Sequence, residues 1–437
     1  MNRGGERSQS HQVPPKYTAR RLAEEQDTVE ALTGMIQTAE PPLAYWASPD
    51  GSEYLATGSV KEIAVPHTTG IGRIKSKADE IFQNIEFDGP EIARPRFIGV
   101  LRFDDRDTDD PAWDGFPEHW FLLPQQLFTR TPTGTWLTST DLCADDTKNS
   151  TAGIEQTTLP EVIDYSVEPD RDTWVTLVES IIDAINDERV TKAVLGNRRQ
   201  LSLTESVNPG VLAKILREKN PGCFVSILQP GTDAYFATAT PERLVSRSKT
   251  TVHSSALAGS LPRGADQSSD SKLSAELQGS SKNAHEHGLV VDSIASRLRQ
   301  TGGLVTVGDR SVRRFRSVQH LHTPIKATYD QVPHVLDIVD ELHPTPAVGG
   351  SPRDAALMSI QESEPFDRRW YAAPLGWFDA DGNGEFAIGI RSAVVSGKSL
   401  TAYAGAGIVA ESDPIEEWNE LQWKYEPICS LFPQHQS

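Results

Sequence analysis

The chain has 437 residues, of which 42 are Lys or Arg and 61 are Asp or Glu, so its formal net charge is −19. This charge repels nucleic acid and anionic membranes, which excludes both as expected partners, and an anionic substrate would need a local cation or arginine in order to bind. With 37% hydrophobic residues, the chain can bury a sizeable core.

The cysteines and the N-terminus indicate a cytoplasmic protein. Cys143, Cys223 and Cys429 are far apart and form no CxxC pair. This usage suits a reducing compartment and offers no thiolate metal site. The sequence also has no apolar signal region at its start and no apolar run of membrane-spanning length.

The N-terminal third is predicted to be rich in strands. Residues 1–25 are polar and are expected to form a disordered tail, which leaves 26–437 as a single domain. Short apolar runs separated by acidic and Pro/Gly-rich loops fill residues 30–170, which predicts strands with few helices. Residues 142–160 are polar and are expected to form a surface loop.

The middle of the chain alternates between helical and strand patterns. Apolar residues three and four apart predict helices, and short apolar runs predict strands. We expect helices over Trp174–Asn186, Val211–Lys219 and Lys282–Arg299, and strands over Val190–Leu195, Cys223–Gln229 and Ala234–Thr238. The Ser- and Asp-rich stretch 264–282 is expected to be mobile.

Hairpins and helices continue to the end of the chain. Ala372–Phe378 and Glu385–Val395 flank DADGNG, which is a hairpin signal. A strand from Tyr403 is expected to turn through Gly405 and Gly407, where backbone N–H groups can approach a ligand. Because no break in composition separates these elements, we predict one large α+β domain with antiparallel sheets.

The last helix carries a charged face. Asp413 is a suitable N-cap and Pro414 fits the first helical position. Glu417, Glu420 and Lys424 follow at spacings of three and four, so they share one face. Two carboxylates and a lysine beside the glycines suggest a divalent cation next to an anionic ligand. The alternative is an ordinary solvated face.

Two further residues are candidates for acid–base chemistry. Lys192 in KAVLG shares a strand face with Val190 and Val194, and partial desolvation favours a basic, neutral amine. The alternative is a lysine that protects an edge strand. Glu242 follows Pro241 at a stiff corner and could act as a general acid if it is poorly solvated; otherwise it is a surface carboxylate.

Two more positions suggest ligand contacts. Glu286 lies between two histidines on a helix, but the spacing does not match a zinc motif, so a single carboxylate ligand for Mg²⁺, joined by Glu420, is favoured. Arg391 follows the small residues Ala387 and Gly389 on one face of a strand. Its guanidinium suits a carboxylate ligand, and the alternative is a structural ion pair.

Taken together, these segments resemble the chorismate-utilising enzymes, and within them the isochorismate synthases. The resemblance covers residues 190–430, in the family's order and spacing. The motifs are KAVLG, TPERLV, ALAGSLPRG, KNAHEHGLVV, VQHLHTPI, LHPTPAVGG, RRWYAAPLGW, GEFAIGIRSA and YAGAGIVAESDPIEEW. The resemblance implies two large, mostly antiparallel β-sheets packed together with helices outside, and a monomer.

It also implies a Mg²⁺-dependent site for chorismate. Lys192 would activate the attacking water, and Glu242 would protonate the departing ring hydroxyl. Glu286 and Glu420 would hold the ion, with Glu417 supporting it through water. The residues implied to bind or line the substrate are Gly259, His320, Ala347, Tyr371, Arg391, Gly405, Gly407 and Lys424. Among these, Arg391 and Tyr371 would hold the enolpyruvyl carboxylate.

One position departs from the family pattern. Three residues before Glu286 the family usually has an acid, whereas this chain has Asn283. The outer shell of the metal would therefore lose one negative charge, although an amide can still hydrogen-bond a coordinated water.

The expected activity is the reversible isomerisation of chorismate to isochorismate, which feeds menaquinone or siderophore biosynthesis. The alternatives are a salicylate synthase, which also eliminates pyruvate, and a non-catalytic chorismate-binding protein. Salicylate-forming relatives tend to carry threonine where this chain has Ala347, which favours the isomerase.

Overall fold

The computed structural model describes residues 14–23, 29–66, 68–106, 109–140 and 158–435. The helices are α1 (Val29–Thr38), α2 (Ile71–Gln83), α3 (Arg171–Asn186), α4 (Pro209–Lys219), α5 (Gln267–Gly279), α6 (Ser281–Gln300), α7 (Val335–Leu342), α8 (Arg353–Ser363) and α9 (Pro414–Cys429). The strands are β1 (Lys16–Arg21), β2 (Leu43–Ala47), β3 (Glu53–Val65), β4 (Glu86–Asp88), β5 (Arg96–Val100), β6 (His119–Thr131), β7 (Gly134–Thr140), β8 (Val162–Glu168), β9 (Lys192–Leu203), β10 (Phe224–Gln229), β11 (Ala234–Thr240), β12 (Arg243–Ser248), β13 (Thr251–Pro262), β14 (Leu304–Val307), β15 (Ser311–Arg314), β16 (Val318–Thr328), β17 (Gly350–Ser351), β18 (Pro374–Asp379), β19 (Gly384–Ile388), β20 (Ser392–Ser396) and β21 (Ser399–Ile408).

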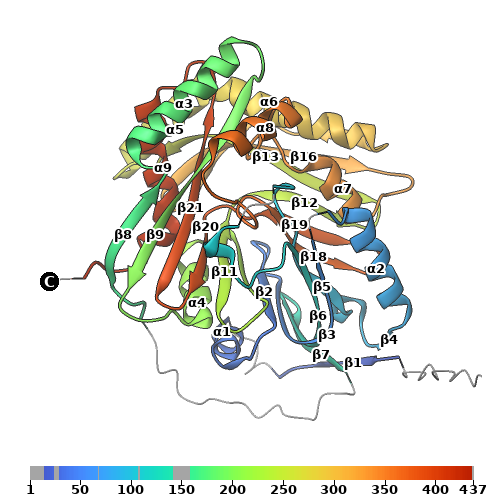
Figure 1. Ribbon diagram of the computed structural model, residues 1–437. Helices are drawn as coiled ribbons and strands as arrows, with labels where there is room; N and C mark the ends of the chain where they lie inside the picture. The colour runs from blue at the N-terminus through green and yellow to red at the C-terminus, as the bar shows by residue number, and fades with distance from the viewer. Residues whose placement is uncertain (1–13, 24–28, 67, 107–108, 141–157, 436–437) are drawn as a thin grey trace, which may run out of the picture.

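Two antiparallel sheets share one long pair of strands (Figure 1). The first sheet has the order β8-β9-β21-β20-β11-β10-β2-β3-β6-β7-β1-β4, and its β1–β4 pair is parallel. The second has the order β3-β6-β5-β18-β19-β12-β13-β16, with β14 and β15 both paired to β16. Residues 53–57 of β3 pair within the first sheet and residues 59–65 within the second, and the register shifts between Ser59 and Lys61.

The pleat of the strands separates two hydrophobic cores. In neighbouring strands β2 and β10, Trp46 and Phe224 lie 5.2 Å apart between ring centroids and join the same cluster as Phe386 of the second sheet. Tyr45 and Val225 point the opposite way, into a second cluster. Because successive side chains of a strand face opposite sides, strands such as β2, β10 and β11 contribute to both cores.

Helices cover the outer faces of the sheets. The second cluster joins the first sheet to α1, α3, α4 and α9, and Figure 1 shows α3 and α9 beside β8 and β9. On the second sheet, α6 packs along β13, while α7 packs against β12 and α2 against α7. The fold class predicted from the sequence is therefore confirmed. Within the described residues, no helix is both long and apolar enough to cross a membrane.

Most predicted elements lie where they were expected, but two predictions were wrong in part. Residues 16–21 of the predicted tail form β1, because Tyr17 is fully buried and its hydroxyl donates to Pro124 O at 2.6 Å. The stretch 264–282 contains α5, which starts with a capping box between Asp266 and Ser269. Residues 1–13 and 24–25 of the tail, and most of the predicted loop 142–160, lie outside the described residues.

Two further corrections concern backbone at the site. The predicted strand Glu385–Val395 is two strands, β19 and β20, and Arg391 lies in the break with φ of 50°. Gly405 and Gly407 do not form a turn. They lie within β21, opposite Gly196 and Val194 of β9.

Candidate active site

A cavity of roughly 720 Å³, including its open mouth, brings the predicted site residues together from both sheets and from α6 and α9. Those that line it are Glu242, Gly259, Glu286, His320, Ala347, Tyr371, Arg391, Gly405, Gly407, Glu420 and Lys424. The two others, Lys192 and Glu417, contact residues at this wall or beside it. The sequence did not single out Leu257, Ser260, Val348, Ile390 or Tyr403, which also line the cavity.

Lys192 is a fully buried lysine at the start of β9. Strand β9 pairs with β21 and β17, so Lys192 does not protect an edge strand. Its ammonium donates to Glu286 Oε1 at 2.8 Å. A Cβ on Gly407 would lie 2.9 Å from Lys192 Cε and 3.1 Å from Glu286 Oε1, so only glycine leaves room for this pair.

Glu242 is a nearly buried carboxyl between β11 and β12, and 5% of it is exposed. Burial raises its pKa to about 7, although Lys192, Arg391 and Lys424 all lower it. A carboxyl with this pKa is partly protonated at neutral pH, as a general acid must be. The sequence-based condition for an acid role, poor solvation, is met.

The charged face of α9 points into the cavity. Lys424 forms a 2.6 Å ion pair with Glu420 and donates to Gly405 O at 2.7 Å. Glu417 is 4% exposed and accepts a hydrogen bond from Ser412 Oγ at 2.7 Å. Burial, and then the charge of Glu420, raise the pKa of Glu417 to about 7. These residues therefore do not form a solvated face.

The chemistry of these acids fits a hard divalent cation. Glu286, Glu417 and Glu420 offer carboxylate oxygens, which Mg²⁺ prefers. Lys282 lies 3.3 Å from Glu417, so each acid is close to an ammonium group that a metal would partly replace. In the described part of the chain, no three such groups already stand in a metal-binding arrangement. Asn283 Nδ2 donates to Ser280 Oγ at 2.9 Å at the start of α6.

Arg391 and His320 form a polar chain along the cavity wall. Arg391 NH2 lies 2.7 Å from His320 Nε2, and His320 Nδ1 lies 2.8 Å from Ser260 Oγ. Burial, followed by Arg391 and Lys424, lowers the pKa of His320 well below its ordinary value. Because a guanidinium can only donate, Nε2 must accept and Nδ1–H must donate to Ser260. The guanidinium of Arg391 is thereby oriented.

Tyr371 is held by close packing. Its ring stacks on Tyr403, with centroids 5.1 Å apart. A Cβ on Gly405 would lie 2.6 Å from the Tyr371 hydroxyl oxygen, so the glycine gives this hydroxyl its space. Arg369 and Ala372, on either side of Tyr371 in sequence, have φ of 46° and 61°.

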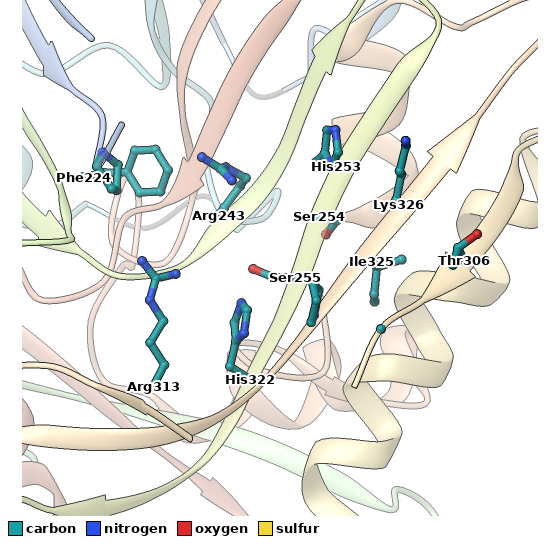
Figure 2. A pocket seen from close by; sticks show the side chains of 13 residues that line it. Phe224, Arg243, His253, Ser254, Ser255, Thr306, Arg313, His322, Ile325 and Lys326 are labelled. Carbon is teal, nitrogen blue, oxygen red and sulfur yellow. The ribbon is translucent and has the colours of Figure 1, made fainter. Parts of the chain in front are cut away.

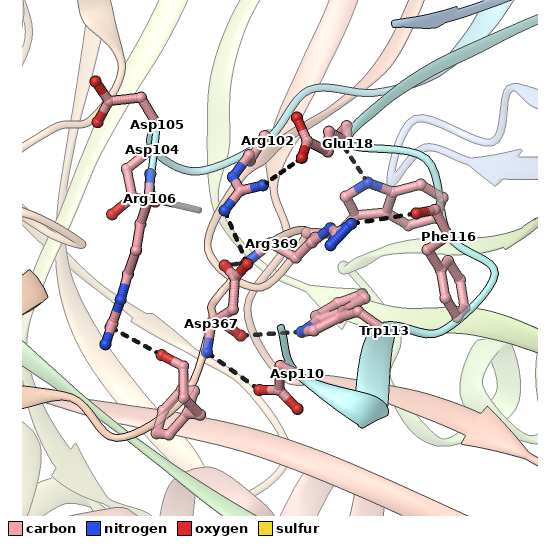
Figure 3. Close-up of polar contacts among 12 residues, drawn as sticks. Arg102, Asp104, Asp105, Arg106, Asp110, Trp113, Phe116, Glu118, Asp367 and Arg369 are labelled. Carbon is pink, nitrogen blue, oxygen red and sulfur yellow. Dashed lines mark hydrogen bonds and ion pairs between the residues drawn. The ribbon is translucent and has the colours of Figure 1, made fainter. Parts of the chain in front are cut away.

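A polar network anchors the segment that carries Tyr371 (Figure 3). Arg102 pairs with Asp367 at 2.8 Å and with Glu118 at 3.1 Å. Trp113 Nε1 donates to Asp367 O at 2.9 Å, and Asp367 N donates to Asp110 Oδ2 at 3.1 Å. The loops after β5 therefore hold a segment far along the chain.

A second buried pair joins this segment to β9 and to the loop at Val348. Arg368 and Glu364 pair at 2.5 Å, one helical turn apart in sequence. Arg368 donates to Val194 O at 2.6 Å and to Val348 O at 2.8 Å, and Glu364 accepts from Gly196 N. The only sequence signal for this pair is the spacing of four between the acid and the arginine.

The family model described as Chorismate binding enzyme matches residues 7–432. The chain therefore belongs to the chorismate binding enzymes. The resemblance found in the sequence is confirmed.

The relatives indicate which branch of the family the chain belongs to. Isochorismate synthase MenF of Bacillus subtilis is 35% identical over 376 residues, covering 82% of this chain and 79% of the relative. The salicylate biosynthesis isochorismate synthase of Pseudomonas aeruginosa is 31% identical over 412 residues, covering 89% and 84%. The structure of MenF, the menaquinone-specific isochorismate synthase from Escherichia coli, aligns with a TM-score of 0.80 at 26% identity, covering 97% of this chain and 96% of that one. The chain is an enzyme of the isochorismate synthase branch.

The raised pKa of Glu242 has a consequence for stability. The unfolded carboxyl titrates near 4.5 and the folded one near 7, so stability present below pH 4.5 is lost as the pH rises through 7. Glu242→Gln should remove this loss and be more stable than the wild type at pH 8 by up to about 3 kcal/mol. Unfolding temperatures of both proteins at pH 4, 6 and 8, with EDTA present, would measure it. An advantage that does not grow with pH would contradict the raised pKa.

Proposed function

We propose that this protein is an isochorismate synthase, which converts chorismate reversibly to isochorismate. The observation that carries the proposal is a buried carboxyl of pKa about 7, Glu242, that lines the cavity, together with a buried lysine, Lys192, that is ion-paired to Glu286 of the same cavity. The charge of Lys192 lowers the pKa of Glu242, so the two groups interact electrostatically.

The reaction needs a base and an acid at two positions of one ring. In the proposed mechanism, Lys192 in its neutral form accepts a proton from a water that attacks C2. Glu242 donates a proton to the C4 hydroxyl, which leaves as water while the ring double bonds shift. Oxygen and protons balance, since one water enters and one departs. General acid and base groups of this kind contribute on the order of 10² to 10⁴ in rate each.

Binding of a dianion by a protein of charge −19 requires local positive charge. Arg391 and Lys424 line the cavity and supply it. We propose that Arg391 and the Tyr371 hydroxyl hold the enolpyruvyl carboxylate. Gly259, Gly405 and Gly407 would offer backbone N–H groups, and His320 would line the ring while fixing Arg391.

Glu286 and Glu420 would hold Mg²⁺ directly and Glu417 through water, which is supported by the chemistry of these three acids. When bound, the ion would neutralise the ring carboxylate and help to orient it. Lys282 and Lys424 lie beside these acids, favour their ionised form and oppose the rise in the pKa of Glu417.

We also propose that the product is released without loss of pyruvate. Ala347 lies at the cavity wall and carries only a methyl group, which cannot orient the enolpyruvyl group by hydrogen bonding. The proposal includes a cytoplasmic monomer that supplies menaquinone or siderophore biosynthesis. Solved structures with similar folds include a menaquinone-specific and a putative 2,3-dihydroxybenzoate-specific isochorismate synthase.

The acid–base assignment can be tested by substitution. Lys192→Ala and Glu242→Gln should each lower turnover by on the order of 10²-fold or more, because each removes one proton transfer. Glu62→Gln, on β3, is a control that should keep the wild-type rate. Steady-state rates with chorismate, together with circular dichroism to check folding, would measure the effect. A folded Lys192 or Glu242 variant with a near-normal rate would remove that residue from the mechanism.

Product analysis separates the isomerase from the alternatives. Purified protein should convert chorismate to a mixture with isochorismate and then stop, without salicylate or pyruvate beyond the non-enzymatic background. Chromatography over several hours at neutral pH would measure this. Enzyme-dependent salicylate with matching pyruvate would instead assign a salicylate synthase, and no turnover at all would favour a non-catalytic chorismate-binding protein.

Chelation tests the proposed metal. EDTA should abolish activity and excess Mg²⁺ should restore it, whereas Glu420→Ala should stay inactive at any Mg²⁺ concentration. Asn283→Asp should lower the Mg²⁺ requirement by on the order of tenfold, because it adds a negative charge near the ligands. Full activity after exhaustive chelation would exclude the ion, and an unchanged requirement in Asn283→Asp would show that Asn283 has no influence on it.

A further inference from the structure

A second cavity opens on the second sheet (Figure 2). It encloses about 840 Å³ of empty space, part of which is open to solvent. Strands β12, β13, β15 and β16 contribute most of its wall, and Phe224 of β10 closes one side. Its size would admit a small ring compound.

The wall of this cavity is basic although the protein is acidic. Its lining side chains include no Asp or Glu, but they include Arg243, Arg313, Lys326, His253 and His322. Burial, and then Arg313, lower the pKa of His322 to about 4, so its ring is neutral at physiological pH. The positive charges of Arg313 and Arg243, which also lower this pKa, favour an anion in the same space.

Arg313 has unused hydrogen-bonding capacity. It donates to Gly222 O at 3.3 Å, and among the described residues no carboxylate lies within ion-pair distance of it. Arg243 differs, because it pairs with Glu385 at 2.8 Å and lies over the ring of Phe224 at 5.4 Å. A guanidinium without an acid partner at a cavity wall is suited to a carboxylate ligand.

Apolar groups supply the rest of the wall. Phe224, Pro49, Pro324 and Ile325 line it together with the basic side chains. A ligand with charge alone would leave these surfaces in contact with water, whereas a ring would cover them.

A small apolar cluster separates this cavity from the proposed active site. Cys223, Leu257 and Phe315 are buried together, and Leu257 also lines the active-site cavity. The ring of Phe315 has Arg313 at 5.2 Å from its centroid and Arg391 at 5.3 Å. An anion on Arg313 would therefore weaken the positive field near Arg391.

We propose that this basic cavity binds a small carboxylate attached to an apolar ring, at a site separate from the one for chorismate. Its occupation raises the KM for chorismate, because the added negative charge opposes the field that attracts the dianion. By linkage, chorismate weakens the second ligand to the same extent but does not displace it. The ligand with this chemistry is an aromatic carboxylate of the kind formed from the reaction's ring carboxylates.

The experiment is a calorimetric titration of the intact protein with benzoate, with and without saturating chorismate. Acetate, benzyl alcohol and inorganic phosphate serve as probes that lack the ring, the charge or the carboxylate. Arg313→Gln should raise the Kd of benzoate by about tenfold or more, since it removes a bidentate contact. Lys326→Gln, at an exposed position, should raise this Kd by about threefold. Arg316→Gln, an exposed arginine three residues from Arg313, is the matched control and should change little.

The expected result is one benzoate site that persists in saturating chorismate. Benzoate should bind more tightly than acetate, phosphate or benzyl alcohol. Benzoate should raise the KM of the wild type but not of Arg313→Gln. The proposal is overturned if benzoate does not bind, if chorismate displaces it completely, if phosphate binds better, or if Arg313→Gln and Lys326→Gln both bind like the wild type.

Titration of chorismate into Lys192→Ala tests whether the two sites are separate. One chorismate binding event with benzoate still bound is expected, and a second chorismate event that displaces benzoate would overturn the proposal. Benzoate binding does not depend on turnover, so loss of the proposed activity and loss of this site can be observed separately.

Discussion

The buried ion pair between Lys192 and Glu286 is the constraint on which the site depends. A lysine with no exposed surface needs a charged partner, since removing one member of such a pair costs about 3–5 kcal/mol. Glu286 comes from α6 on the second sheet and Lys192 from β9 of the first, so the pair fixes how the two sheets meet. The ion pair also requires glycine at position 407, because the two side chains occupy the volume that a Cβ of Gly407 would need.

Further contacts hold the remaining groups around this pair. Arg368 and Glu364 join backbone groups of β9 to the loop at Val348, and the Asp367 network joins the Tyr371 segment to the loops after β5. These contacts are buried and far apart in sequence. The cavity is therefore shaped largely before a ligand arrives, which limits the ordering cost of binding.

The sequence predicted the fold class and most of the site because the motifs carry local signals. Asp413 and Pro414 identified the start of α9, and the spacing of Glu417, Glu420 and Lys424 identified its charged face. What it could not predict depends on long-range packing. The sequence of β1 is polar, yet the strand pairs with β7 and β4. The strand predicted over Glu385–Val395 also breaks at Arg391, where φ is positive, and no residue pattern predicts this break. The strand position of Gly405 and Gly407 has the same origin, since a glycine pair is equally typical of a turn.

Strand pairs that are distant in sequence also bear on how the chain folds. Strand β9 pairs with β21, with Ser202 opposite Ser399, although the two are about 200 residues apart in sequence. It also pairs with β17, which follows α7 in the chain. Pairings this distant close large loops before they gain contacts, which slows folding and prolongs exposure of unpaired strand edges. A ribosome releases β9 long before β21 exists, so the edge of β9 that β21 will cover stays open during much of synthesis. Chaperone capture at that stage would protect the segment that begins with Lys192.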